Sequence, residues 1–242
     1  MIAKHFYLSV VTVIYMSKYK KVFLLFFILL FPSVFYIILS TGKHHFIYLN
    51  YLGPKTAISK KDTAFFKIPF QPLTNHKNVS LDSSYLGMYI KVVNAFDSQN
   101  KVAYAPTMAQ FVRLQEKLKD YQLVKLISIS AQTTNNSIDE LNAYADEVHC
   151  NYTNVKWHIT KFTTPDFATT FFTELQKAIA IDTQPIALEK AVYLIDKESH
   201  IRGVYDGSVL KEINRLVDDI KILLAEYSIL EKKKEKRKNN ER

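Results

Sequence analysis

The sequence predicts an α/β sandwich, a central mixed sheet with helices on both faces, behind one N-terminal transmembrane helix. Three observations support this prediction. Residues 22–39 form an uncharged apolar run, residues 63–228 alternate between strand-like and helix-like patterns, and residues 189–207 read as two strands joined by a polar turn. Alternating strands and helices are typical of a sheet covered on both faces. The 242 residues suffice for one anchor and one domain of ordinary size.

The apolar run from Val22 to Leu39 is the predicted membrane anchor. Its 18 uncharged residues would span about 27 Å as a helix, close to the thickness of the hydrocarbon core. Lys18, Lys20 and Lys21 precede the run and only Lys43 follows it closely. This asymmetry predicts a cytoplasmic N-terminus and a domain on the extracytoplasmic side of the cell (inner) membrane. A cleavable signal peptide is the alternative, but its apolar core would be unusually long and a good cleavage site is missing after it.

The chain is expected to divide into five segments. These are a basic N-terminal segment (1–21), the transmembrane anchor (22–39), a juxtamembrane linker (40–62), the globular domain (63–228) and a basic tail (229–242). Glycine, proline and lysine without a sustained period favour the linker. Met1 and Met16 are both candidate starts, because the residues from Met16 onward form a compact anchor by themselves.

Residue patterns place the elements of the domain in order. Tyr89–Phe96 is rich in β-branched and aromatic residues, as expected of a core strand. Ile138, Leu141 and Tyr144 follow helical spacing behind Ser137, the expected N-cap. Strands are expected at 89–96, 123–129, 156–160, 191–195 and 201–205, and helices at 108–118, 138–148, 166–179 and 209–224, after short extended pieces at 67–73 and 79–82.

The charge distribution argues against a nucleic-acid partner. The net charge is +9, of which residues 1–21 contribute +4 and residues 231–242 another +4, which leaves +1 for the body. A protein that binds phosphate backbones carries its basic surface on the folded domain. We therefore expect no nucleic acid among the partners.

Cysteine usage limits the redox chemistry. Cys150 is the only cysteine, so one chain can form neither an internal disulfide nor a dithiol redox cycle.

A series of short motifs occurs in order behind the anchor and ends near Tyr227. They are Gly42-Lys43, Tyr51-Leu-Gly-Pro-Lys55, Val92-Val-Asn-Ala-Phe96, Arg113-Leu-Gln-Glu116, Lys156-Trp-His158 and the closing Ile201-Arg-Gly-Val-Tyr-Asp-Gly207. This series resembles the Sco/SenC family, the membrane-tethered, thioredoxin-like copper proteins associated with cytochrome c oxidase assembly. The resemblance implies a thioredoxin-like sandwich and a copper-related process.

The ligand positions that this resemblance implies do not carry ligands. The family uses a Cys-x-x-x-Cys pair and one distant histidine, a soft site suited to copper. Alignment without gaps places the two cysteine positions at Asn100 and Tyr104, and the histidine position at Ala187. A rival register places the pair at Ala105 and Ala109, again without a thiol. An acidic loop expected after the second core strand reads Gln132-Thr-Thr-Asn-Asn136, with the carboxylates gone.

A degenerate family member is therefore expected: a non-catalytic, membrane-anchored accessory or scaffold module with no copper of its own. Its partners would be the bilayer, through residues 22–39, and an unidentified protein. Tyr104 and Met108 are the candidate anchors of that protein contact.

Two alternatives stay open. His149, Cys150 and His158 form a His-Cys-x7-His cluster that could bind a metal with ligands foreign to the family, as could the pair His44-His45. A thiol enzyme would have to work through Cys150 alone, with a resolving thiol from another molecule.

Overall fold

The computed structural model describes residues 18–41, 48–59, 62–132, 136–150, 156–164 and 166–240. The chain divides into two units, Met1–Phe46 and Ile47–Arg242. The candidate starts and the pair His44-His45 lie outside the described residues.

The first unit contains the helix α2, Lys18–Thr41. Its segment Lys18–Ile37 is long and apolar enough to cross a membrane, and none of that segment is buried against protein. Pro32 lies inside the helix, where a proline is tolerated in membrane spans. The expected apolar helix is present at the expected place.

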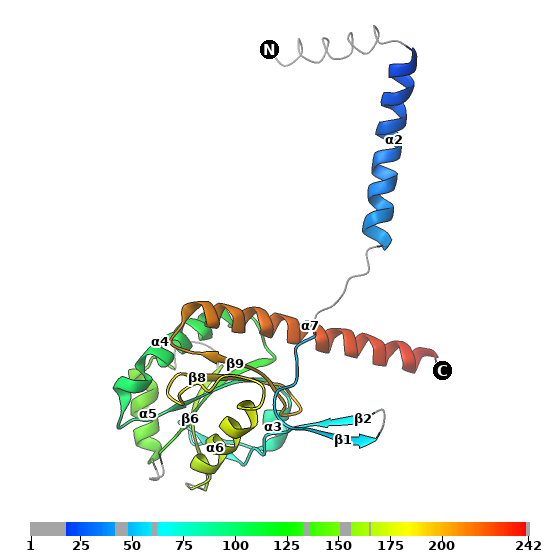
Figure 1. The fold of residues 1–242 in the computed structure, drawn as a ribbon. Helices are drawn as coiled ribbons and strands as arrows, with labels where there is room; N and C mark the ends of the chain where they lie inside the picture. Colours follow the sequence, from blue (N-terminus) through cyan, green and yellow to red (C-terminus); the bar gives the residue numbers. More distant parts are fainter. Residues whose placement is uncertain are drawn as a thin grey trace, which may run out of the picture. The chain divides into compact units, whose positions relative to one another are not determined.

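The second unit is built on a seven-stranded mixed sheet with the strand order β4-β3-β7-β6-β5-β8-β9 (Figure 1). β5, β6 and β7 run parallel to one another, while the outer pairs are antiparallel. The strands are β3 (Leu73–Asn75), β4 (Ser80–Leu81), β5 (Ile90–Phe96), β6 (Val124–Ser130), β7 (Trp157–Phe162), β8 (Ala191–Ile195) and β9 (Ile201–Asp206). The predicted central mixed sheet and its closing hairpin are confirmed.

Helices cover both faces of this sheet. Trp157 and Phe162 are five residues apart on β7, so their side chains point to opposite faces. Trp157 contacts Phe111 of α4, and Phe162 contacts Phe171 of α6. The helices are α3 (Ser83–Gly87), α4 (Lys101–Lys117), α5 (Ile138–Glu147), α6 (Phe167–Ile179) and α7 (Leu210–Asn240).

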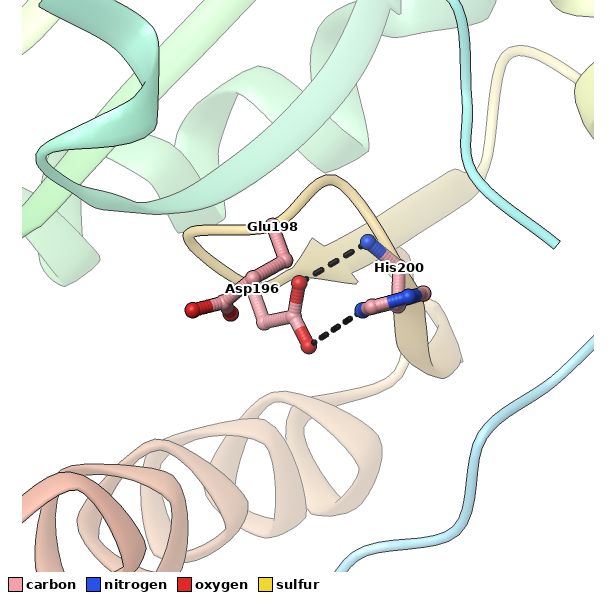
Figure 2. Close-up of side chains that lie close together, drawn as sticks. All are labelled: Asp196, Glu198 and His200. Atoms are coloured by element: carbon pink, nitrogen blue, oxygen red, sulfur yellow. Dashed lines mark hydrogen bonds and ion pairs between the residues drawn. The ribbon is translucent and has the colours of Figure 1, made fainter. Parts of the chain in front are cut away.

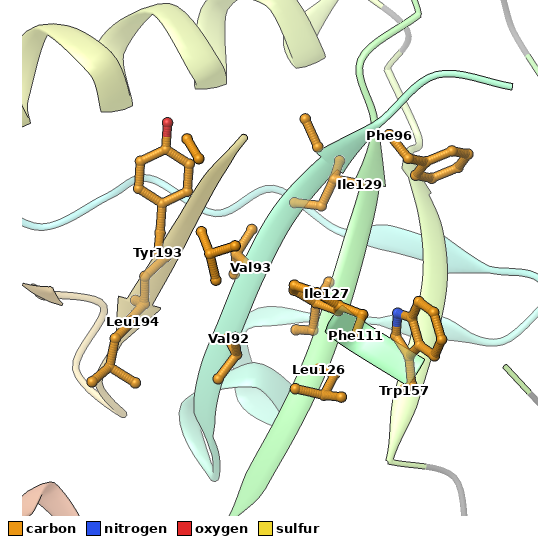
Figure 3. Close-up of a cluster of buried hydrophobic side chains, with 14 of the residues drawn as sticks. Val92, Val93, Phe96, Phe111, Leu126, Ile127, Ile129, Trp157, Tyr193 and Leu194 are labelled. Atoms are coloured by element: carbon orange, nitrogen blue, oxygen red, sulfur yellow. The ribbon is translucent and has the colours of Figure 1, made fainter. Parts of the chain in front are cut away.

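The core lies between the central strands and these helices (Figure 3). All seven residues of β5 are buried, as are the five of β8, because both strands have neighbours on each side and helices above and below. Trp157 is 2% exposed and belongs to this core, as its short apolar strand indicated.

Local sequence signals account for the start of α5. The Ser137 hydroxyl accepts a hydrogen bond from the backbone N–H of Glu140, and the Glu140 carboxylate accepts one from the N–H of Ser137. This reciprocal capping box satisfies two donors that the first turn would otherwise leave free. The predicted N-cap is confirmed.

The folded unit begins earlier than the expected linker allows. The N–H of Leu49 donates to Glu226 of α7, and Leu52 pairs with Ile201 of β9. A separate antiparallel hairpin follows, β1 (Lys55–Ser59) and β2 (Asp62–Phe65). Residues from Leu49 onward are therefore part of the domain, because their backbone is satisfied by the core strands and α7.

The other end of the domain differs as well. The basic tail is not a separate segment, since α7 continues to Asn240 (Figure 1). Helix-forming lysine, arginine and glutamate residues carry the helical pattern past the last apolar contacts.

Candidate functional site

The candidate site lies where the parallel strands β5 and β6 end. Loops that follow the carboxyl ends of neighbouring parallel strands meet at one edge of the sheet and are a frequent place for binding sites. A surface pocket of about 480 Å³ opens there between the first turns of α4 and the face of α5. It is lined by Ser98, Gln99, Lys101, Gln132, Asn136, Glu140, Ala143, Tyr144 and Glu147.

Side-chain amides and hydroxyls surround the Asp97 carboxylate at this edge of the sheet. The Gln132 amide donates to Asp97 Oδ1 at 2.5 Å and to Ser98 Oγ at 3.1 Å. The buried Asn136 amide donates to Gln132 Oε1 at 2.6 Å and accepts from Ser130 Oγ at 2.7 Å. Neutral groups of this kind bind other polar groups but supply neither a base near neutral pH nor a soft metal ligand.

Asn100 and Tyr104 lie on the turn that begins α4. Asn100 is the N-cap residue, is exposed, and makes no side-chain cap hydrogen bond. Tyr104 is 8% exposed. Burial raises the pKa of the Tyr104 phenol, and the nearby carboxylates of Asp97 and Glu189 raise it further. The phenol is therefore a neutral, packed group.

The segment that precedes β8 lies against this same turn. Thr107 Oγ1 of α4 donates to the carbonyl of Glu189 at 2.8 Å. The exposed Ala187 stands two residues before Glu189, and the Lys190 carbonyl accepts from the N–H of Gly207 at 2.6 Å. The structure thus joins the segment before β8 to α4 at Thr107, whereas Ala187 itself lines a pocket beside Ile179 and Ala180 at the end of α6.

These three residues do not fit a copper ion. Cu(I) prefers thiolate, thioether and imidazole ligands. Asn100 offers an amide, Tyr104 a protonated phenol, and Ala187 a methyl group. No soft donor is among them, so no chemistry through copper can be built on these positions.

The rival register lies on a different side of α4. Ala105 and Ala109 line a second pocket of about 230 Å³, together with Lys101, Met108, Val112, Tyr144, Glu147, Val148 and His149. This pocket faces α5, and its lining combines apolar side chains with the ion-paired Lys101 and Glu147. The Ala105 and Ala109 positions thus face α5, whereas Thr107 of the same helix holds the segment that precedes β8.

Tyr104 and Met108, which were expected to contact a protein partner, are buried in the structure. Tyr104 is 8% and Met108 3% exposed, because both side chains turn inward and join the core. The residue that does project from this turn is Val102, whose side chain is 86% exposed. We call Asn100, Val102 and Ala105, three exposed residues at the start of α4, the α4 patch.

Cys150 is a packed thiol. It is 4% exposed, and its Sγ donates to the carbonyl of Trp157 at 3.2 Å. Burial raises the pKa of the Cys150 thiol to about 12. A thiol with this pKa is almost wholly protonated at neutral pH and is a poor nucleophile and metal ligand.

His158 is held as a neutral hydrogen-bonding residue. Asn75 Oδ1 accepts from the backbone N–H groups of Lys77 and Val79, which turns the Asn75 amide NH₂ toward His158 Nδ1 at 3.3 Å. Nδ1 is therefore the acceptor, and Nε2–H donates to the Tyr85 hydroxyl at 3.3 Å. Burial lowers the pKa of His158 to about 3, with smaller contributions from the cations Lys125 and Lys77.

The His149, Cys150 and His158 cluster is not assembled. His149 is exposed at the end of α5, with a positive φ of 56°. In the described part of the chain, the one group of three possible ligands with atoms within 4.8 Å of one another is Asp196, Glu198 and His200. The three residues are close in the sequence but do not form one group in space, because His149 and Cys150 follow the end of α5 whereas His158 lies on β7.

Sequence reasoning missed the Asp196, Glu198 and His200 group (Figure 2). Asp196 Oδ1 accepts from the N–H of His200 at 2.8 Å, and Oδ2 accepts from His200 Nδ1 at 3.2 Å and from Arg202 Nη1 at 3.3 Å. Glu198 accepts from the Tyr227 hydroxyl at 2.5 Å. The carboxylates are thus occupied by donors, and a cation there would sit beside the buried Arg202 guanidinium. The donor set fits a structural charge network rather than a metal site.

Comparison with known proteins was made at the level of sequence and of structure. No protein-family model and no curated protein matches the chain. Among solved structures, it is similar to a SCO1/SenC family lipoprotein from Bacillus anthracis, with a TM-score of 0.52 and 17% identity over 65% of this chain and 95% of that one. It is also similar to BsSco, described as a member of the Sco family of cytochrome c oxidase assembly proteins, with a TM-score of 0.51 and 20% identity over 65% of this chain and 93% of that one. The domain therefore has the Sco/SenC-like thioredoxin fold that the motifs predicted.

Proposed function

We propose that this chain is a membrane-anchored, Sco/SenC-like protein that acts as a non-catalytic accessory or scaffold module in copper handling or cytochrome c oxidase assembly. One observation carries the proposal. The start of α4 and the segment before β8 are held together by the Thr107–Glu189 hydrogen bond, and the ligand positions that the resemblance implies on these two segments are occupied by Asn100, Tyr104 and Ala187. The scaffold is kept and its soft ligands are missing.

The single thiol supports the same proposal. Cys150 lies in the core with its pKa raised to about 12 by burial. A peroxidatic or disulfide-exchange mechanism requires an accessible thiolate. The burial of this thiol supports action by binding rather than by thiol chemistry.

The anchor places this module at a membrane. α2 has the length and composition of a membrane span, and the lysines at its start favour a cytoplasmic N-terminus. The domain then works on the extracytoplasmic side. One protein similar in fold is described as a lipoprotein.

A protein partner contacts the α4 patch. Val102 is a large apolar side chain with 86% of its surface exposed, next to the polar pocket lined by Ser98 and Lys101. An exposed apolar residue beside satisfied polar groups is the arrangement of an interface centre with a polar rim. Asn100 belongs both to the α4 patch and to the ligand positions that the resemblance implies.

Site-specific photocrosslinking in native membranes tests this proposal. A photoreactive residue at position 102 is compared with one at Thr173, an exposed residue of α6. The proposal expects a defined product from position 102 that is absent from position 173 and is lost when Ala105 is replaced by Glu. Equal products from both positions, or products from 102 that ignore Ala105→Glu, would contradict a contact at the α4 patch.

A further inference from the structure

The C-terminal part of α7 extends past the folded body of the domain. Glu226 is the last buried residue of α7, and every residue from Glu231 to Asn240 is exposed. Figure 1 shows this end of α7 extending past the rest of the domain. We call residues 231–240 the basic extension. It continues a helix whose earlier turns pack on β9, so its direction is set by the domain.

The basic extension carries uncompensated positive charge. It has six cations, Lys232, Lys233, Lys234, Lys236, Arg237 and Lys238, against Glu231 and Glu235. Cations repeat four residues apart, so like charges adjoin along the helix and destabilise it by a few tenths of a kcal/mol per pair, roughly. Among the described residues, none of the six forms an ion pair. An anionic surface would supply the missing partners.

The basic extension begins close to Leu49, the residue through which the chain from the anchor is held to the domain. Glu226 Oε1 accepts from the N–H of Leu49 at 2.7 Å, and Arg202 Nη2 donates to the carbonyl of Leu49 at 2.8 Å. Arg202 and Glu226 are themselves paired at 2.7 Å. From Glu226 to Glu231 the helix rises by only about 8 Å.

The chain between anchor and domain is short. Leu49 follows Thr41, the last residue of α2, by eight positions, a reach of at most about 29 Å even when fully extended. A tether of this length keeps Leu49 near the surface of any bilayer that α2 crosses. The start of the basic extension lies close to Leu49 and is kept near that surface as well. Because of this tether, binding of the extension to the membrane surface is an intramolecular event with a high effective concentration.

We propose that the basic extension docks on the anionic lipid headgroups of the membrane that holds its own anchor. This inference rests on the proposed membrane anchor. Anionic headgroups match the charge, need no preformed pocket, and lie within reach of the tether. On a leaflet as anionic as the cytoplasmic one, each basic residue strengthens such a contact about fivefold. The net charge of +4 on the extension therefore favours binding to an anionic leaflet at low salt.

The experiment uses the full chain reconstituted into vesicles. A donor fluorophore is attached through Asn239→Cys, since the buried Cys150 is protected from labelling, and an acceptor is carried by a lipid. Vesicles are made of phosphatidylcholine alone or of phosphatidylcholine with phosphatidylglycerol. Energy transfer is expected to rise with phosphatidylglycerol and to fall back at high salt, because screening weakens exposed charge interactions.

Matched charge variants make the test specific. The first replaces Lys233, Lys234, Lys236 and Arg237 by Gln, a residue of similar helix propensity. The control replaces four exposed lysines of the body, Lys117, Lys119, Lys177 and Lys190, by Gln. The tail variant should lose the phosphatidylglycerol response and the control should keep it, although both lose the same charge.

The failures of the two proposals are distinguishable. Resistance to carbonate extraction from neutral vesicles reports the anchor alone, so its loss would count against the membrane anchor itself. A chain that resists extraction but shows no response to phosphatidylglycerol, or responds equally in both variants, would overturn the docking of the extension. A preference for soluble polyglutamate over phosphatidylglycerol vesicles at equal charge concentration would point to an acidic protein instead and would also overturn it.

Discussion

Thr107 Oγ1 donates a hydrogen bond of 2.8 Å to the backbone carbonyl of Glu189. The two residues lie 82 positions apart in the sequence. Their contact joins the first turns of α4 to the segment that precedes β8. It links the two segments on which the Sco/SenC resemblance implies metal ligands, at the positions of Asn100, Tyr104 and Ala187.

Thr107→Val removes this hydrogen bond and keeps the shape of the side chain. The Glu189 carbonyl would lose a partner in a buried setting, so the free energy of unfolding should fall by about 1 kcal/mol. Denaturant unfolding of the detergent-solubilised chain measures the change. Thr173→Val, at an exposed position of α6, should change it by less than about 0.5 kcal/mol. Equal effects of the two variants would mean that the Thr107 contact does not join the two segments.

Cys150 should resist alkylation in the folded protein. Burial raises its pKa to about 12, so at pH 8 the folded state contains about a thousandfold less thiolate than an ordinary cysteine. Iodoacetamide labelling followed by mass spectrometry should show slow modification that becomes fast in denaturant. A cysteine introduced by Asn239→Cys on the exposed end of α7 serves as the reactive reference. Rapid modification of Cys150 in the native protein would reopen the thiol-enzyme alternative.

His158 should make the protein sensitive to acid. Its folded-state pKa is lowered to about 3, chiefly by burial, whereas in the unfolded chain it titrates near 6.5. Below pH 6.5 the unfolded state binds a proton that the folded state does not, so stability is complete above this pH and falls as the pH decreases toward 3. The slope contributed is about 1.4 kcal/mol per pH unit.

The matching variant is His158→Gln, which keeps hydrogen-bonding capacity but cannot titrate. Plots of unfolding free energy between pH 4 and pH 7 should be flatter for this variant by about one proton. Parallel curves for the two proteins would show that His158 is already able to accept a proton in the folded state.

Arg202 should be among the most sensitive positions of the domain. It is 6% exposed and pairs with Asp196 and Glu226, both buried. Arg202→Leu leaves two buried carboxylates without their cation, which costs about 3–5 kcal/mol of stability. Hydrogen exchange should also show a faster-exchanging Leu49 amide, since Arg202 helps to hold Glu226, its acceptor. Arg113→Leu on the exposed side of α4 is the control, with an expected change below about 0.5 kcal/mol. A similarly small change in the free energy of unfolding for Arg202→Leu would refute the role of Arg202 in holding Glu226 and Leu49 together.

The central elements were predictable because each has a strong local signal. Ala191–Ile195 is a continuous apolar run of strand length, Ile90–Phe96 is rich in β-branched and aromatic residues, and the structure makes both core strands. Ser137 stands three residues before Glu140, and the capping box forms as the pattern predicts. Parallel packing of β5, β6 and β7 follows from strands that alternate with helices.

Long-range polar contacts could not be predicted in this way. Arg202, Asp196 and Glu226 form one network from three separate elements, and no periodicity in the sequence relates them. The β1–β2 hairpin was missed because its strands are short and polar. The inward orientation of Tyr104 was missed for a different reason: both sides of the first turn of α4 carry apolar residues, and packing decides which is buried.

Stoichiometric Cu(I) binding tests most directly the claim that the scaffold is intact and its soft ligands are absent. The wild-type chain is compared with a variant that combines Asn100→Cys, Tyr104→Cys and Ala187→His. We predict that the wild type retains no copper after a competing chelator, and that the triple variant retains about one ion per chain because Thr107 and Glu189 already hold the two segments together. Stoichiometric copper on the wild-type protein, or none on the triple variant while it remains folded, would contradict the account.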